Sequence, residues 1–347
     1  MATPEVTLTH LDESLFDGAN ATKRDLIDYL EAVADRLVPQ LSGRPLSVIR
    51  VRAGQQPFMQ KNMPAYAPSW IQTVSVWSQS SSRSVRYALC DDRATLIWFG
   101  NQRAVEYHVP LGIDPERPGY IVLDIDPPEG AAFGLAVEAA LLVRQALTDS
   151  GLSGAVKTSG AKGLHIYVPV DASAADAAAA TRALAARAER LDPSIATTAY
   201  IKADRGGKVF IDSTRSYGAT VASVYSPRIR PGVPVSFPVA WDALASVSPG
   251  DFTVRNAAGL LGDGDPWTAA LPSPQQLSAE LLEEGHAIPV ARVVAMHEGK
   301  RRRRAESELL GLRPAVGRYR EAERGRQRDT LAILAGREHL IAGLSAR

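Results

Sequence analysis

Residues 120–127, Y-I-V-L-D-I-D-P, restrict the fold of this chain more than any other segment. Their apolar run is typical of a buried strand, and it leads directly into Asp124 and Asp126. Alternate side chains of a strand share a face, so the two carboxylates should project together. Adjacent carboxylates repel each other unless a cation lies between them, and hard ions such as Mg²⁺ or Mn²⁺ prefer oxygen ligands. The segment therefore indicates a strand that ends at a metal site, or one whose acids only cap the next element.

Size and composition exclude several classes of protein. A chain of 347 residues allows one large or two ordinary domains, and its 45% hydrophobic and 22% charged residues are typical of a globular protein. The single cysteine, Cys90, cannot form an internal disulfide and fits a reducing compartment. No apolar stretch reaches the ~20 residues of a membrane-spanning helix, and the N-terminus lacks a signal-peptide pattern. We expect a cytoplasmic protein without a membrane partner.

Charge is unevenly distributed, although the net charge is only +1. Residues 300–347 contain 13 Lys/Arg and 6 Asp/Glu, a balance of +7, which leaves −6 on the preceding residues. A basic tail on a mildly acidic body favours a polyanionic partner, and the run K-R-R-R-R with Arg301 and Arg302 could contact a phosphate backbone. The same composition also fits a solvated helix whose arginines pair with its own glutamates.

Periodicity predicts the order of helices and strands. Helices are expected over residues 23–41, 94–101, 131–150 and 171–191, and strands over residues 45–52, 71–77, 85–89, 106–109, 120–126, 155–158, 164–170 and 209–212. Residues 57–70 and 227–238 are predicted to be irregular. The two kinds of element alternate imperfectly, which favours an α+β fold with mixed or antiparallel sheets flanked by helices. We expect a catalytic domain over residues 1–284 and a basic, helical extension over residues 285–347.

A glycine-bounded turn forms a second candidate for chemistry. The motif K-T-S-G-A-K-G-L-H-I-Y-V-P, residues 157–169, places Ser159, Lys162 and His165 near one another. Its glycines let backbone N–H groups approach an anion closely, and the lysine and histidine add charge or donors. A lone histidine after a turn is, however, more often a packed or capping residue than a ligand.

Two later segments add an acid and three arginines. V-F-I-D-S-T-R ends a strand on Asp212 and continues to Arg215, and Y-S-P-R-I-R puts Arg228 and Arg230 on one face of an extended segment. An aspartate at a strand end can simply cap the next element, and R-x-R on an edge strand can be a solvated face. Taken together with Asp124 and Asp126, however, three acids can hold two metal ions while Lys, His and Arg hold a triphosphate. Phosphoryl transfer requires that set of groups.

The ordered motifs D-I-D-P, S-G-A-K-G-L-H-I-Y-V-P and V-F-I-D-S-T-R resemble the primase-polymerases of the archaeo-eukaryotic primase superfamily. The chain is most similar to the polymerase domain of bacterial ligase D and its stand-alone actinobacterial relatives. The resemblance extends to R-P-L-S-V-I-R, F-M-Q-K-N, Y-S-P-R-I-R-P-G-V-P-V-S and D-F-T-V-R-N, and covers roughly residues 23–267. No K-x-D-G adenylation motif is present.

The resemblance implies a role for each matching residue. Asp124, Asp126 and Asp212 would be the catalytic carboxylates that bind two Mn²⁺ or Mg²⁺ ions. Lys23 would bind a 5′-phosphate on the downstream strand, and Phe58 would lie near the templating base. The residues that would contact the incoming nucleotide are Ser159, Lys162, His165, Arg228, Arg230, Arg215, Thr220, Lys61 and His108.

The same resemblance implies template-directed addition of ribo- or deoxyribonucleotides to a primer 3′-hydroxyl during repair by gap filling or end joining. Gapped or broken duplex DNA, nucleoside triphosphates and other repair proteins would be the partners of a nucleoid-associated monomer. A primer-synthesising primase and a non-catalytic DNA-binding repair module are the alternatives. A haloacid-dehalogenase-type phosphatase also begins with strand-D-x-D, but Pro128 stands where that class needs Thr or Val.

Three departures from the family pattern concern the grip on DNA. Glu13 or Ser14 stands where relatives often carry a second phosphate-binding lysine, and Phe58-Met59 replaces a usual Phe-Phe pair. The interval between Asp212 and Arg228 is one residue shorter, with Ser216-Tyr217 in place of a glycine-containing turn. Dependence on a 5′-phosphate and the contacts with the template therefore stay open at this point.

Overall fold

The computed structural model describes residues 4–52, 54–78, 82–216 and 219–290. They belong to one compact unit, Met1–Ala291, and a second unit comprises Arg292–Arg347. The division expected at residue 284 falls inside helix α7 (Ala279–Ala287), and residues 291–347 of the expected extension lie outside the described residues. The first unit contains every expected site residue except Arg301 and Arg302.

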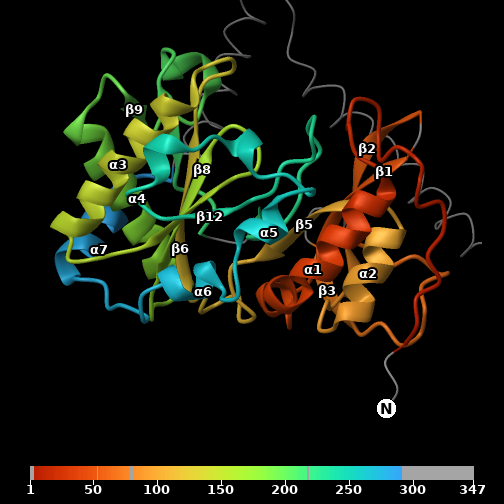
Figure 1. Ribbon diagram of the computed structural model, residues 1–347. Coiled ribbons are helices and arrows are strands. Elements are labelled where there is room, and N and C mark those ends of the chain that lie inside the picture. The colour runs from red at the N-terminus through yellow and green to blue at the C-terminus, as the bar shows by residue number, and fades with distance from the viewer. Residues whose placement is uncertain (1–3, 53, 79–81, 217–218, 291–347) are drawn as a thin grey trace, which may run out of the picture. The chain divides into compact units, whose positions relative to one another are not determined.

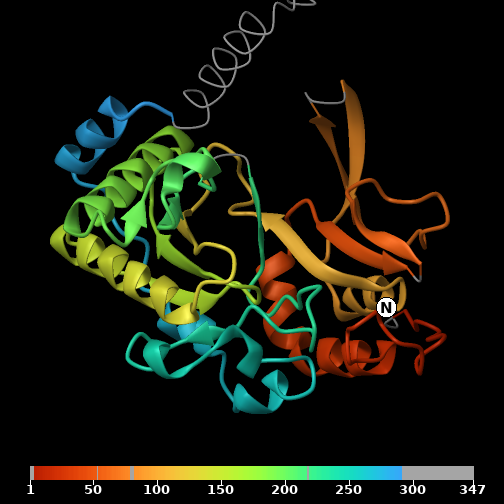
Figure 2. The same cartoon turned by 90° about the horizontal axis from the view of Figure 1, so that it is seen from above.

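The largest sheet has six strands and carries its helices on one face. In spatial order the strands are β12 (Pro238–Val239), β7 (Ala155–Thr158), β8 (Leu164–Pro169), β6 (Tyr120–Asp126), β10 (Val209–Asp212) and β9 (Ala196–Thr197). All neighbours are antiparallel except β9 and β10. Helices α3 (Phe133–Asp149) and α4 (Ala174–Leu191) lie side by side against the sheet, and α7 packs on α4 (Figures 1 and 2). The predicted α+β class is confirmed.

Strand β6 lies inside this sheet because one of its faces is entirely apolar. Ile121, Leu123 and Ile125 have no exposed surface and belong to the core that includes the apolar faces of α3 and α4. Burying such a side chain stabilises the fold by about 1.5–3 kcal/mol. Alternation along the strand then directs Asp124 and Asp126 to the opposite face, away from the helices.

A second sheet has the strand order β11 (Thr220–Ala222), β5 (Ala104–Pro110), β1 (Ser47–Arg52) and β2 (Gln55–Gln60). Helices α1 (Lys23–Leu41) and α2 (Arg93–Asn101) pack against each other and against β5. Part of β2 falls in the segment predicted to be irregular, and that prediction is wrong. The strand carries little apolar pattern and contains Pro57, which an edge strand tolerates because one row of its N–H groups needs no partner.

Smaller elements complete the first unit. The hairpin of β3 (Thr73–Ser78) and β4 (Arg83–Ala88) projects away from the two larger sheets (Figure 2). Residues 227–237 are irregular, as predicted, whereas Pro238, the last residue of the predicted segment, begins β12. The short helices are η1 (Lys202–Arg205), η2 (Leu244–Ser246), η3 (Pro249–Asp251), α5 (Ala257–Leu260) and α6 (Pro266–Ala270). Within the described ranges, none of the helices combines the length and apolarity that crossing a membrane requires.

Candidate active site

A row of four side chains crosses the six-stranded sheet. Lys157 on β7 pairs with His165 on β8, His165 pairs with Asp124 on β6, and Asp124 pairs with Asp212 on β10. Directly opposed residues of antiparallel strands have Cβ atoms about 4.5–5.5 Å apart and point to the same face. Asp126 lies two positions along β6 on that face. Strand register therefore brings together three acids and a histidine that are far apart in the sequence.

These residues line a cavity of about 480 Å³. Nine of the expected site residues share its wall: Asp124, Asp126, Asp212, Ser159, Lys162, His165, Arg215, Arg228 and Arg230. Tyr200, Phe210 and Arg205 also contribute, and sequence reasoning had not singled them out. The cavity thus combines carboxylates with a larger number of cationic and hydrogen-bonding groups.

Arg215 lies between two of the acids. Its Nε atom is 3.2 Å from Oδ2 of Asp124 and 3.2 Å from Oδ2 of Asp212. Burial raises the pKa of Asp124 to about 6; Arg215 acts in the opposite direction, and the nearby charges of Asp212 and Asp126 add to the rise. An ionised Asp124 is therefore costly in this position unless positive charge stays close to it.

Asp126, the third acid, lies close to two cationic side chains. Oδ1 of Asp126 lies 3.1 Å from Lys162 Nζ, and its Oδ2 lies 3.3 Å from Arg205 Nη1. In the part of the chain that the structure describes, no group of three or more His, Cys, Asp or Glu side chains has the geometry of a metal site. The acids face guanidinium and ammonium groups, which shows that this face attracts positive charge.

The S-G-A-K-G turn is closed by its own serine. Oγ of Ser159 accepts hydrogen bonds from the amides of Ala161 and Gly163, both at 3.2 Å. The expectation that the turn offers these amides to an anion is therefore wrong for the two that Ser159 occupies. The hydroxyl hydrogen of Ser159 remains able to donate into the cavity, because the oxygen acts as acceptor in both contacts.

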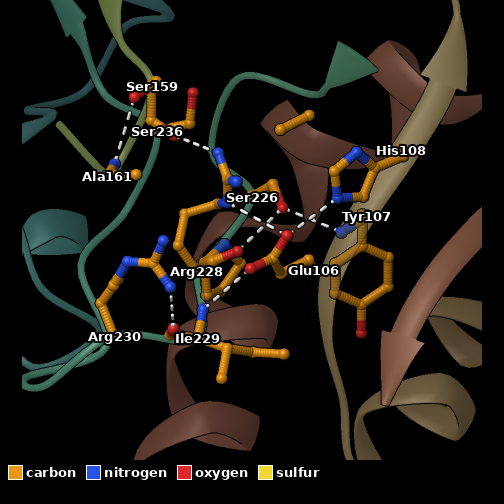
Figure 3. Close-up of polar contacts among 12 residues, drawn as sticks. Glu106, Tyr107, His108, Ser159, Ala161, Ser226, Arg228, Ile229, Arg230 and Ser236 are labelled. Atoms are coloured by element: carbon orange, nitrogen blue, oxygen red, sulfur yellow. Dashed lines mark hydrogen bonds and ion pairs between the residues drawn. The ribbon is translucent and has the colours of Figure 1, made fainter. Parts of the chain in front are cut away.

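Arg228 joins the turn to the second sheet (Figure 3). Its Nη1 donates to the carbonyl of Ser159 at 2.6 Å, and its Nε lies 3.1 Å from Oε2 of Glu106 on β5. The side chain passes close to Gly160, where a Cβ atom would lie only 2.6 Å from Cγ of Arg228. A glycine at this position therefore leaves the room that the arginine needs.

Glu106 is the buried anion that holds this arrangement (Figure 3). Besides Arg228, it contacts Nε2 of His108 at 2.9 Å and accepts from the amide of Ile229 at 2.9 Å. Burial by itself raises the pKa of Glu106, but the hydrogen bond to His108, the charge of Arg228 and the Ile229 amide outweigh it and lower the pKa to about 2. His108 and Arg228 thus share one counter-ion.

Besides His108, four expected contacts in the described part of the chain lie outside this cavity. Lys61 and Thr220 line a second groove, which Arg215 also borders. Lys23 is buried at the start of α1, where its Nζ donates to the carbonyl of Thr9 and burial lowers its pKa. Phe58 lies on β2, with the guanidinium groups of Arg50 and Arg52 5.7 and 5.1 Å from its ring centroid.

Sequence reasoning missed three residues that hold the site together: Glu106, Lys157 and Arg205. The spacing of Glu106 and His108 offered a signal, since residues two apart in a strand share a face. Lys157 precedes the turn motif and gave no sign that it would be buried. Arg205 lies on η1, a few residues before the V-F-I-D-S-T-R motif but outside it, and only the folded chain brings it to Asp126.

Replacing Glu106 with glutamine should destabilise the protein by about 3 kcal/mol at neutral pH, because Arg228 and His108 lose their shared counter-ion. The folded-state pKa of Glu106 is depressed, so its contribution is present above an unfolded pKa near 4.5. That contribution is lost as the pH falls towards 2. Urea unfolding at pH 7, 4 and 3 measures both effects.

The exposed Glu138→Gln, on α3, is the matched control and should change little. A Glu106→Gln protein whose unfolding free energy equals that of the wild type at pH 7 would contradict the counter-ion role.

One cavity of this α+β domain holds carboxylates at strand ends that face arginine, lysine and histidine. This arrangement is typical of the class of enzymes that transfer phosphoryl or nucleotidyl groups. The family model described as LigD, primase-polymerase domain, matches residues 22–267, and the chain belongs to this family. The LigD primase-polymerase domain is a nucleotidyltransferase. The resemblance noted in the sequence is confirmed.

Individual relatives agree with the family match. The chain is 33% identical over 259 residues to the bifunctional non-homologous end joining protein LigD of Bacillus subtilis, covering 72% of this chain and 41% of the relative. It is 34% identical over 254 residues to the multifunctional non-homologous end joining DNA repair protein LigD of Mycobacterium tuberculosis, covering 69% and 33%. It therefore spans about a third to two fifths of these relatives.

A solved structure shows the same fold. The polymerase domain of Mycobacterium tuberculosis ligase D, in complex with DNA, matches with a TM-score of 0.69 and 31% identity, covering 77% of this chain and 99% of that chain.

Proposed function

We propose that the chain adds nucleotides to a primer 3′-hydroxyl opposite a template, at short gaps or breaks during DNA repair. The observation that carries this proposal is the cross-strand row, which places Asp124 between His165 and Asp212 in the cavity that Arg228 also lines. Relatives that act in non-homologous end joining, and a structural neighbour in complex with DNA, support repair synthesis on DNA.

The donor atoms of the three acids fit divalent metal ions, although in the described part of the chain these side chains face cationic groups and do not form the geometry of a metal site. Asp124, Asp126 and Asp212 offer only carboxylate oxygens, which suit Mg²⁺ and Mn²⁺. Arg215 lies between two of these acids, so positive charge is already favoured there. Two ions held by the three carboxylates would neutralise phosphate charge and favour deprotonation of the attacking hydroxyl.

The other side chains have separate tasks in this proposal. Arg228 and Arg230 bind phosphate oxygens, for which the planar guanidinium is well suited. His165 and Ser159 donate hydrogen bonds to the triphosphate, and Lys162 adds charge beside Asp126. Together they orient the α-phosphate and stabilise the departing pyrophosphate by fixed charges.

A gapped duplex with a labelled primer tests the proposal. The protein is incubated with each ribo- or deoxyribonucleoside triphosphate in Mg²⁺ or Mn²⁺, and the primer products are resolved by length. We expect template-matched extension that stops when ions are chelated. Binding of the duplex without extension in either ion would instead support a non-catalytic DNA-binding module.

Primer synthesis is a second candidate, since the matching family is described as a primase-polymerase. The same reaction on a single-stranded template without primer separates the two activities. Dinucleotide products would show that the chain can initiate, and their absence alongside gap filling would restrict it to extension.

A further inference from the structure

Lys157 is a fully buried lysine next to His165, in the row of side chains that crosses the sheet. Its side chain has no exposed surface, and within the described ranges no ion pair with a carboxylate involves it. Burial lowers the pKa of Lys157 well below its ordinary value; the charge of Arg228 acts in the same direction, and Asp124 opposes both. A buried lysine without a carboxylate partner is costly, so its neighbours must compensate for it by hydrogen bonds.

Three atoms surround the ammonium group. Nζ of Lys157 lies 2.6 Å from Oγ of Ser236, 2.7 Å from Nδ1 of His165 and 3.1 Å from the carbonyl oxygen of Ala222. The Ala222 carbonyl can only accept. The Ser236 hydroxyl donates its hydrogen to the carbonyl of Thr158 at 2.8 Å, so towards Lys157 its oxygen must also accept. Two of the three contacts therefore require Lys157 as donor.

The third contact fixes the tautomer of His165 only together with the charge of Lys157, because a neutral amine whose two hydrogens face Ser236 and Ala222 would accept from Nδ1–H. An ammonium has three N–H donors and no acceptor, so a charged Lys157 can face Nδ1 only if that nitrogen carries the lone pair. The hydrogen of the neutral ring then lies on Nε2. On the other side of the ring, Nε2 is 3.5 Å from Oδ1 of Asp124. A carboxylate oxygen at this distance favours a hydrogen, rather than a lone pair, on Nε2.

We propose that Lys157 is a positioning residue: by donating to Nδ1 it holds His165 in the Nε2–H tautomer and presents that N–H to the cavity. The functional part of this inference rests on the proposed nucleotidyl transfer, in which Nε2–H donates to a phosphate oxygen. With the opposite tautomer, Nε2 would offer its lone pair to an anion and repel it. At metal sites, too, a partner of the second ring nitrogen fixes the tautomer of a histidine, although there the partner accepts the N–H.

Nuclear magnetic resonance of ring-¹⁵N-labelled histidine reads the tautomer directly. The chain has six histidines, and the His165→Gln variant identifies the signals of His165. In the ligand-free wild type we expect a protonated Nε2 and an unprotonated Nδ1. Lys157→Met, which has a similar length but no donor, should shift the Nδ1 signal. Lys157→Gln retains an N–H donor and should resemble the wild type more closely.

The control is Lys202→Met on η1, an exposed lysine outside the cavity, which should leave both ring signals unchanged. Nucleotide incorporation by Lys157→Met should fall about 10–100-fold, and Lys157→Gln should recover part of the loss.

A wild-type ring protonated on Nδ1 would overturn the inference, as would Nδ1 signals that do not differ between Lys157→Met and the wild type. If Lys157→Met does not fold, the wild-type spectrum still decides. If the wild type incorporates no nucleotide, the proposed function fails while the tautomer measurement stands.

Discussion

Replacing both Asp124 and Asp126 with alanine should reduce nucleotide incorporation by about 10³-fold or more, while binding of the gapped duplex persists. The two carboxylates supply two of the three acids in the cavity and face Arg215, Lys162 and Arg205. Under the proposed function, the remaining Asp212 could not hold two divalent ions, so the attacking hydroxyl would lose the bound charge that favours its deprotonation. Primer extension in Mn²⁺ and a duplex-binding titration measure the two effects separately.

The variant should fold, because the ionised form of Asp124 is disfavoured in its surroundings. Burial and the neighbouring acids raise its pKa to about 6, so alanine removes a group that is costly when charged. Asp242→Ala combined with Asp263→Ala is the matched control, since it removes two exposed aspartates from the surface. Extension at the wild-type rate by the cavity variant would refute the assignment of these acids.

The strand that carries these acids could be predicted because local pattern and tertiary position agree. An apolar run that leads into acids predicts this strand without knowledge of its neighbours in the sheet. Periodic apolar positions likewise predict the helix at residues 23–41 and the helix of the alanine-rich segment. For α1 the agreement extends to its ends: Thr22 and Asp25 form a capping box, which fixes the first turn.

The pairing of the acids with His165 could not be read from the sequence. Asp124 and Asp212 are neighbours only because β10 pairs with β6, and a shift of one residue would send every side chain to the other face. Glu106 belongs to another sheet. It contacts Arg228 only because the irregular segment after residue 226 brings the arginine to it. Such contacts depend on register and on loop paths, for which local sequence carries little signal.

The residues that would carry the chemistry could be predicted more readily than the residues that hold them in position. Acids, His165 and the arginines stand in short motifs whose residue types are unusual for strand ends and turns. The groups that hold them, Lys157 and Glu106, are buried ionisable side chains; the spacing of Glu106 and His108 indicates a shared strand face, but no linear pattern shows that either group is buried. Burial of a charge is a property of the assembled fold, so these positions emerge only when the strands are in place.

Gly163→Ala should be the most destabilising single substitution at the turn, by about 3 kcal/mol or more. A Cβ atom at this position would lie 2.0 Å from the carbonyl oxygen of Ile125 on β6, far inside van der Waals contact. The backbone of one strand would have to move by more than an ångström, next to the Ile125–Leu164 pair that begins the β6–β8 ladder. Because the same ladder aligns His165 with Asp124, incorporation should fall together with stability.

Urea unfolding and primer extension on the same preparation test this coupling. Gly134→Ala, in the first turn of α3, is the matched control: its added methyl meets no atom within 4 Å, and alanine favours a helix over glycine by up to about 1 kcal/mol. It should leave incorporation unchanged and stability equal or slightly higher. A Gly163→Ala protein with the wild-type unfolding midpoint would show that β6 and β8 can separate at this end without cost. The alignment of the acids with His165 would then have to depend on contacts further along the two strands.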